Sequence, residues 1–158
     1  MATNSKNLDS LLLITTQNFN DINTYLQENK RSNLSVLILA GGWMEALHIT
    51  CQVAQANPSN EQLIEKIGEQ KITLDNIVQL LQFYTQDPAI ADLHKQIVEL
   101  KATFDQIEIL TLYAESTMEE VNGIIVVKDN SSTTVKITTE NVEAIRSQVL
   151  KIRESIIS

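Results

Sequence analysis

The sequence predicts a mainly α fold, an antiparallel bundle of about five helices with one β-hairpin before the last helix. The chain of 158 residues contains only four glycines and two prolines, and this scarcity favours long helices with short connections. Apolar residues recur at helical spacing over most of the chain, whereas one late stretch is rich in β-branched residues on both sides of a turn-like segment. The length indicates a single domain, 1–158.

The first two predicted helices differ in how their apolar residues are distributed. The second, 34–56, is apolar on nearly every side in its first half, which is typical of a central helix that contacts several neighbours. The polar segment 28–33 provides the turn, and Asn33 is a candidate cap for the second helix. The first helix, 8 to about 27–29, has one apolar stripe, formed by Leu8, Leu12, Phe19, Ile22 and Leu26.

Two more helices follow, each introduced by turn residues. Pro58 ends the second helix, and Ser59 or Asn60 caps the third, 61–86. Its polar patch 68–71 is either a solvated face or part of a polar cluster near Trp43 and Glu45. Asp87 then caps the fourth helix, with proline in the first turn. Its apolar residues step by three and four, at Ile90, Leu93, Ile97, Leu100, Phe104 and Ile107.

After about Met118 the pattern changes to that of strands. Residues 123–128 and 133–137 are β-branched and flank the turn-like segment 129–132, so a hairpin is predicted at about 123–137. Thr138 or Thr139 caps the final helix. Because an isolated two-stranded hairpin is marginal in water, we expect it to cover the end of the bundle. An exposed edge that accepts a strand from a partner or a second copy is the alternative.

Composition excludes several classes of function. The net charge of −8, from 20 acidic and 12 basic residues, opposes binding to nucleic acid and to anionic membranes. The longest apolar run, 34–44, is shorter than the about 20 residues of a membrane span, so no transmembrane segment is predicted. Cys51 is the only cysteine, which rules out an intrachain disulfide and a thiolate zinc cluster. No metal or cofactor is predicted.

The most distinctive candidate site lies on the second helix, at Gly41, Gly42 and Trp43. Each glycine inside a helix costs about 1 kcal/mol relative to alanine, so something should offset that cost. Close approach of a neighbouring helix, with Trp43 covering the gap, is the favoured explanation. The alternative is a small pocket beside Trp43 in which a ligand reaches the backbone.

Glu45 and His48 have the Glu-x-x-His spacing that binds metal in carboxylate bundles when two such motifs are present. The second motif is missing, because Ala91 lies three residues before His94. A polar pair satisfied by a neighbouring helix is therefore favoured. A nucleophilic pair of Cys51 with His48 is disfavoured because no oxyanion donor is identifiable, so the chain is not expected to be an enzyme.

Three segments carry a resemblance to known proteins. They are 41–49 (Gly-Gly-Trp-Met-Glu-Ala-Leu-His-Ile), 67–81 (Ile-Gly-Glu-Gln-Lys-Ile-Thr-Leu-Asp-Asn-Ile-Val-Gln-Leu-Leu) and 134–137 (Thr-Val-Lys-Ile). Along most of its length the chain resembles the C-terminal part of a family of uncharacterised helical lipoproteins from Bacteroidetes. The resemblance implies a cell-envelope or periplasmic location and no activity. A cytoplasmic location is expected if Met1 is the true start without a leader.

The sequence thus favours a non-enzymatic helical module for interaction or assembly, with an unknown protein partner or by self-association. The runner-up is a small-molecule binding protein with a pocket near Trp43. For that reading the candidate ligand-binding residues are Gly41, Gly42, Trp43, Glu45 and His48.

Overall fold

The computed structural model describes residues 2–121 and 124–157. The predicted mainly α class, with five helices and paired strands before the last one, is confirmed. The helices are α1 (Ala2–Glu28), α2 (Ser32–Ala56), α3 (Glu61–Gln82), α4 (Pro88–Phe104) and α5 (Thr139–Ile157). The strands are β1 (Glu108–Leu112), β2 (Thr117–Val121), β3 (Ile124–Lys128) and β4 (Ser132–Lys136).

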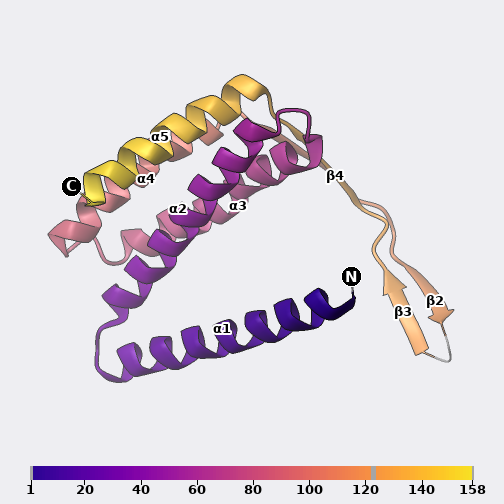
Figure 1. Cartoon of the computed structure of the whole chain (residues 1–158), viewed down its shortest axis with the longest axis horizontal. Helices are drawn as coiled ribbons and strands as arrows, with labels where there is room; N and C mark the ends of the chain where they lie inside the picture. Colours follow the sequence, from indigo (N-terminus) through magenta and orange to yellow (C-terminus); the bar gives the residue numbers. More distant parts are fainter. Residues whose placement is uncertain (1, 122–123, 158) are drawn as a thin grey trace.

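Four of the five helices, α2 to α5, enclose one hydrophobic core. Neighbouring helices in this bundle are α2 with α3, α3 with α4, α4 with α5, and α5 with α2. Helix α1 lies outside it and diverges from α2 beyond their common turn (Figure 1). Fully buried side chains come from all four bundle helices and include Cys51, Ile67, Leu74, Leu81, Ile90, Ile97, Leu100, Phe104, Ile145 and Val149.

Helix ends follow local capping chemistry in three of the predicted places. The side chain of Asn60 accepts a hydrogen bond from the Leu63 N–H at 3.1 Å, and Asp87 accepts one from the Ala89 N–H at 3.1 Å. Thr138 Oγ1 accepts one from the Asn141 N–H at 3.3 Å before α5. These caps satisfy N–H groups that have no partner inside the helix.

The prediction that Asn33 caps α2 is wrong. Helix α2 begins at Ser32, and Arg31 precedes it without a side-chain capping bond. The Asn33 amide instead donates to Asp87 Oδ2 at 3.2 Å, which ties the start of α2 to the start of α4. Asn33 thus bonds to a residue distant in sequence and does not cap its own helix.

The turn between α1 and α2 is a Schellman motif. Lys30 has a φ of 57°, the left-handed conformation that usually selects glycine at this position. The Arg31 N–H donates to the Leu26 carbonyl at 2.7 Å, and the Lys30 N–H donates to the Gln27 carbonyl at 3.0 Å. This three-residue connection sets the direction in which α2 leaves α1.

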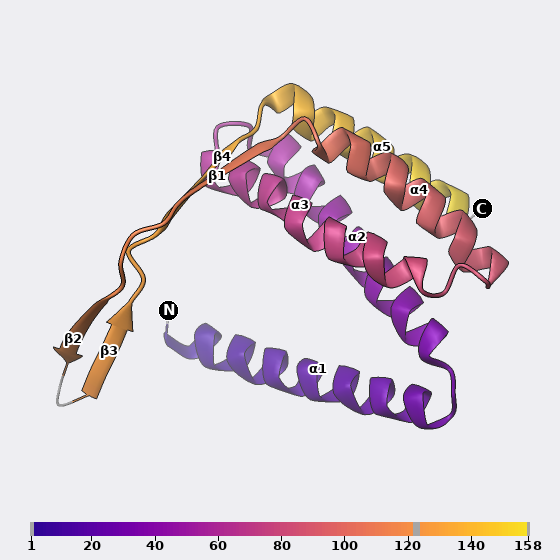
Figure 2. The same ribbon diagram turned by 180° about the vertical axis from the view of Figure 1, so that it is seen from behind.

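The hairpin predicted at 123–137 has the wrong strand partners. Strand β3 pairs antiparallel with β2, and β4 pairs antiparallel with β1. The strands therefore form a long two-stranded arm, described at 108–121 and 124–136, which we call the ribbon. Its inner half is β1–β4, and its outer half is β2–β3, which projects from the bundle (Figures 1 and 2).

The predicted turn residues lie in the middle of the ribbon, where they join its two halves. Asp129 Oδ1 accepts a hydrogen bond from the Ser131 N–H at 2.9 Å, as in an Asx turn. The Asn130 amide donates to the Glu115 carbonyl across the ribbon at 2.8 Å, and Ser131 Oγ accepts from the Ala114 N–H at 3.3 Å. The predicted turn therefore forms, but it connects β3 to β4 within the ribbon and does not join two strands that pair with each other.

The inner half of the ribbon rests on α3 at Gly68. A Cβ on Gly68 would stand 2.5 Å from Val135 Cγ1 and 3.5 Å from Ile107 Cγ2. Glycine is therefore required for β4 to pack directly on the helix. Nearby, Lys71 Nζ donates to the Ile107 carbonyl at 2.8 Å. The expectation that the strands cover the bundle holds for this half of the ribbon alone.

Helix α2 is long and apolar enough to cross a membrane, with a mean hydropathy of 1.5 in its most apolar window. The core helix of a soluble protein meets the same criterion. The absence of a transmembrane segment stays a prediction. One face of α2 enters the core through Val36, Ala40, Met44, Leu47, Cys51 and Ala54.

Candidate functional site

The two glycines of the candidate site are exposed on α2. A Cβ built on Gly41 or Gly42 would meet nothing within 4 Å. The prediction that a neighbouring helix approaches them closely is therefore wrong for this structure. The physical reason is the divergence of α1, the helix that shares a turn with α2 (Figure 1).

Trp43 lies beside α3, as expected if the polar patch 68–71 forms a cluster near Trp43. Its indole Nε1 donates to Gln70 Oε1 at 3.0 Å, so the single polar group of the indole is satisfied within the chain. The rest of the patch is engaged elsewhere: Glu69 pairs with Lys66 at 2.7 Å, and Lys71 donates to the Ile107 carbonyl. Only Gln70 joins the candidate site.

Glu45 bonds to α5 and not to α3, the helix that carries Gln70, the partner of Trp43. Its Oε2 accepts from Arg153 Nε at 2.8 Å. This hydrogen bond, with the charge of Arg153 and a smaller effect of His48, lowers the pKa of Glu45 below its ordinary value. The pair is solvent-exposed, so it contributes little to stability.

His48 is not the hydrogen-bonded partner of Glu45 that its spacing suggests. Its Nδ1 is buried and has no hydrogen-bond partner among the residues that the structure describes. Within 2–121 and 124–157 no group of three His, Cys, Asp or Glu side chains is placed to hold a metal ion. We expected a buried or partly buried polar pair satisfied by a neighbouring helix. Glu45 has such a helix partner in Arg153 but is exposed, and the Nδ1 of His48 has no partner among the described residues.

Cys51 lies fully buried in the core. Burial raises the pKa of its thiol to about 11. Nucleophilic cysteines need the opposite, a thiolate stabilised by nearby positive charge or a helix N-terminus. Cys51 therefore has the environment of a core residue.

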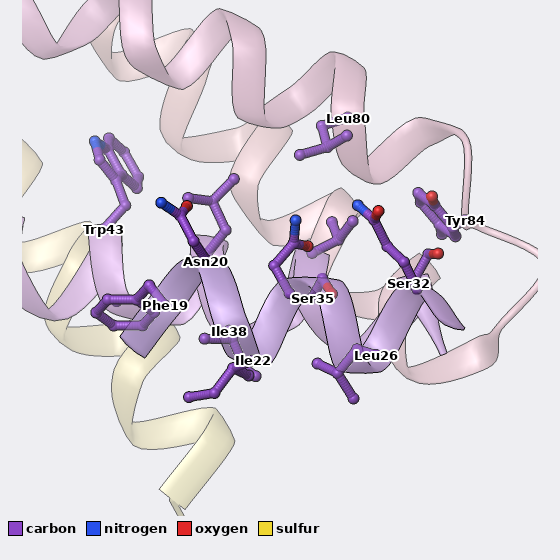
Figure 3. Close-up of a pocket in the computed structure, with 15 residues that line it drawn as sticks. Phe19, Asn20, Ile22, Leu26, Ser32, Ser35, Ile38, Trp43, Leu80 and Tyr84 are labelled. Carbon is purple, nitrogen blue, oxygen red and sulfur yellow. The ribbon is translucent and has the colours of Figure 1, made fainter. Parts of the chain in front are cut away.

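A cavity of about 690 Å³ occupies the angle between α1 and α2, beside the end of α3 (Figure 3). Of the predicted site residues, only Gly42 and Trp43 line it. Prediction missed the contributions of α1 and α3, although the apolar stripe of α1 was already visible in the sequence. Helix α1 contributes Phe19, Ile22 and Leu26, α3 contributes Leu80, and the turn after α3 contributes Tyr84.

Large exposed apolar side chains gather on the two parts that project from the bundle. Among the described residues, α1 carries eight of the 25 and the ribbon another eight, so the arms account for most of this surface. Clustered exposure of this kind marks interaction sites. The ribbon set is Leu110, Leu112, Tyr113, Met118, Ile124, Ile125, Val126 and Val127.

The chain matches no protein-family model, no curated protein and no solved structure. The resemblance to Bacteroidetes lipoproteins stays a prediction. The cavity between α1 and α2, which we call the groove, and the two projecting parts, α1 and the ribbon, are the features available for binding.

Proposed function

We propose that this protein is a non-enzymatic assembly module that self-associates through the outer half of its ribbon. The observation that carries the proposal is the placement of β2 and β3, which project from the bundle and pair with each other in the part of the chain that the structure describes (Figure 2). An isolated two-stranded ribbon is marginal in water. A partner that covers it would supply the missing stabilisation.

Strand β3 presents apolar residues on both faces of the outer ribbon, whereas β2 places Glu120 opposite Ile125 and Glu119 opposite Val126. On one face Ile125 and Val127 stand beside Met118, which is the register partner of Val127. On the other face lie Ile124 and Val126. All five side chains are exposed, from 44% for Val126 to 77% for Met118. The apolar side chains of β3 fit stacking on a second ribbon, with the glutamates of β2 left at the margin of the contact.

The free edge of β3 also supports assembly. Each strand of a two-stranded ribbon has one edge of unpaired N–H and C=O groups, and such edges accept further strands. Natural proteins protect edges with prolines and inward-pointing charges. β3 (Ile-Ile-Val-Val-Lys) contains no proline and only one charge, at its end.

A charge on the apolar face should prevent self-association without unfolding the bundle. The test variant is Ile125→Lys with Val127→Lys, and the matched control is Ala144→Lys with Ser147→Lys on the exposed side of α5. Light scattering of the wild-type and control chains should give a mass that rises with concentration, whereas the ribbon variant should stay monomeric. A wild-type mass that equals the monomer at every concentration would refute the proposal.

Binding of an apolar small molecule is the second candidate function. It is supported by the cavity between α1 and α2, whose volume lies in the range of ligand pockets, about 300–1,000 Å³. Trp43, the only tryptophan, lines the cavity, so a bound apolar dye should change its emission. Leu39 also lines the cavity, so Leu39→Phe places a larger side chain in it and should weaken that change. An emission unaffected by apolar dyes would count against a ligand pocket.

The family resemblance adds a proposed location in the cell envelope. Secretion with an N-terminal lipid would be supported by a signal and a lipidated cysteine upstream in the coding sequence. Detection of the native protein in the cytoplasmic fraction would contradict it.

A further inference from the structure

Helix α2 carries a second, uncharged and mostly apolar stripe on a side that is turned away from its core face. Its positions step by four, three, four, three and four residues, the spacing of a helix-packing seam. Leu39, Ile49 and Val53 are each about half exposed, and Gly42 and Ala46 between them are exposed as well. We call this stripe the outer seam of α2. It consists of Ser35, Leu39, Gly42, Ala46, Ile49 and Val53.

Helix α1 carries a stripe with the same steps. Its exposure rises away from the turn: Leu26 is 8% exposed, Ile22 is 47% exposed and Leu12 is 57% exposed. We call this stripe the seam of α1. It consists of Leu26, Ile22, Phe19, Thr15, Leu12 and Leu8, read from the turn outward.

The three-residue turn sets the register in which these seams would meet. At the turn end the groove already brings both seams together, because Leu26, Ile22 and Phe19 line the same cavity as Ser35, Leu39 and Gly42 (Figure 3). If this antiparallel register continues away from the turn, each remaining residue of the seam of α1 lies opposite a residue of the outer seam of α2. The further pairs are Thr15 with Ala46, Leu12 with Ile49, and Leu8 with Val53.

Side-chain sizes are complementary in this register. The largest residue of the α1 seam, Phe19, falls opposite Gly42, which has no side chain and open space before it. Thr15 falls opposite Ala46, and the outer pairs join aliphatic residues of similar size. Neither seam contains a charged residue, so contact would bury no uncompensated charge. Close approach of this kind would also offset the cost of glycine within α2.

We propose that α1 docks along the outer seam of α2 of its own chain, and that the groove is the turn end of this interface in an open state. The occupant is α1 of the same chain, because the short turn presets the register and keeps the two seams at a high effective concentration. Closure fills the cavity and covers both seams, while the ribbon remains free. The inference is independent of ribbon-mediated assembly.

Engineered disulfides test this docking directly. In a Cys51→Ala background, Leu12→Cys is combined with Ile49→Cys, a pair that the closed register places face to face at the open end of the groove. The matched control combines Leu13→Cys, one position off the seam, with Ile49→Cys. A disulfide needs Cα atoms within about 7 Å. Under mild oxidation of dilute protein, the seam pair should close within the monomer at least about ten times faster than the control, a ratio that corresponds to a barrier difference of about 1.4 kcal/mol.

A second pair of variants tests the close approach at the glycine. Gly42→Leu fills the space opposite Phe19 and should slow closure of the seam disulfide, whereas Gly41→Leu, off the seam, should leave it nearly unchanged. Circular dichroism confirms that each chain stays helical. Equal closure of the seam and control pairs would overturn the proposal. So would a cross-linked dimer formed from a mixture of the two single-cysteine chains, which would assign the seam to α1 of a second copy.

Discussion

Replacing Gly68 by alanine probes the contact that anchors the ribbon to the bundle. The new methyl group would stand 2.5 Å from Val135 Cγ1, closer than any real contact, and 3.5 Å from both Ile107 Cγ2 and Ile137 Cδ1. Val135 is a stiff β-branched residue, 8% exposed. Relief of the clash therefore requires β4 to move away from α3.

The expected magnitude comes from two opposing effects. Alanine is favoured over glycine inside a helix by about 1 kcal/mol, whereas forcing an extra methyl group into a packed contact costs about 1–3 kcal/mol. Gly68→Ala should therefore range from neutral to destabilising by about 2 kcal/mol. Gly41→Ala is the matched control, since its methyl group meets nothing within 4 Å. It should stabilise the chain by about 1 kcal/mol.

Urea unfolding followed by far-ultraviolet circular dichroism measures both effects through the transition midpoint. A double-mutant cycle isolates the contact: in a Val135→Ala background the clash is gone, and Gly68→Ala should become stabilising. The coupling between the two sites should be about 1–3 kcal/mol. If Gly68→Ala stabilises the chain as much as Gly41→Ala and shows no coupling to Val135, the account of the ribbon anchor fails.

Three further predictions concern single side chains. Asp87→Ala removes the acceptor for the Ala89 N–H and should destabilise the chain by about 1 kcal/mol in urea unfolding; unchanged stability would contradict this cap. The Cys51 thiol is buried, and its pKa is raised to about 11. It should therefore react with a disulfide reagent at neutral pH only as fast as the chain unfolds. Rapid labelling of the native protein would refute its burial. Arg153 lowers the pKa of Glu45 below 4.5 in the folded chain, so the ion pair stabilises above about pH 4.5 and is lost as the pH falls through the lowered pKa. Because the pair is exposed, the destabilisation by Glu45→Gln at neutral pH should be small, and it should disappear in acid; a difference from wild type that is independent of pH would exclude this role.

Helical spacing and capping residues were sufficient to predict the helices because both signals are local. Asn60 and Asp87 cap helices where expected, and the seam of α4 from Ile90 to Phe104 is buried. The strand pairing could not be predicted in the same way, because it depends on partners distant in sequence. The Asp129–Ser131 turn has strong local turn chemistry, and nothing local indicates that Asn130 binds Glu115 across the ribbon.

The candidate site shows the same division between local and tertiary effects. Glycine within an apolar helix favours close approach of a neighbouring helix, and the cavity that Gly42 and Trp43 border is the less favoured alternative. The pairing of Trp43 with Gln70 is one of the two interpretations of the patch 68–71. The bond from Arg153 to Glu45 joins residues 108 positions apart, and no spacing rule indicates it. The divergence of α1 depends on the left-handed Lys30, an unusual choice where glycine is expected.

Hydrogen exchange of the backbone amides in 117–121 and 124–128, measured at low and high protein concentration, tests ribbon-mediated assembly most directly. Because an isolated two-stranded ribbon is marginal, these amides should exchange rapidly in dilute protein and become protected as concentration rises. Exchange in α2 to α5 should stay the same and provides the internal reference. Ribbon amides whose exchange is independent of concentration would contradict the proposed assembly.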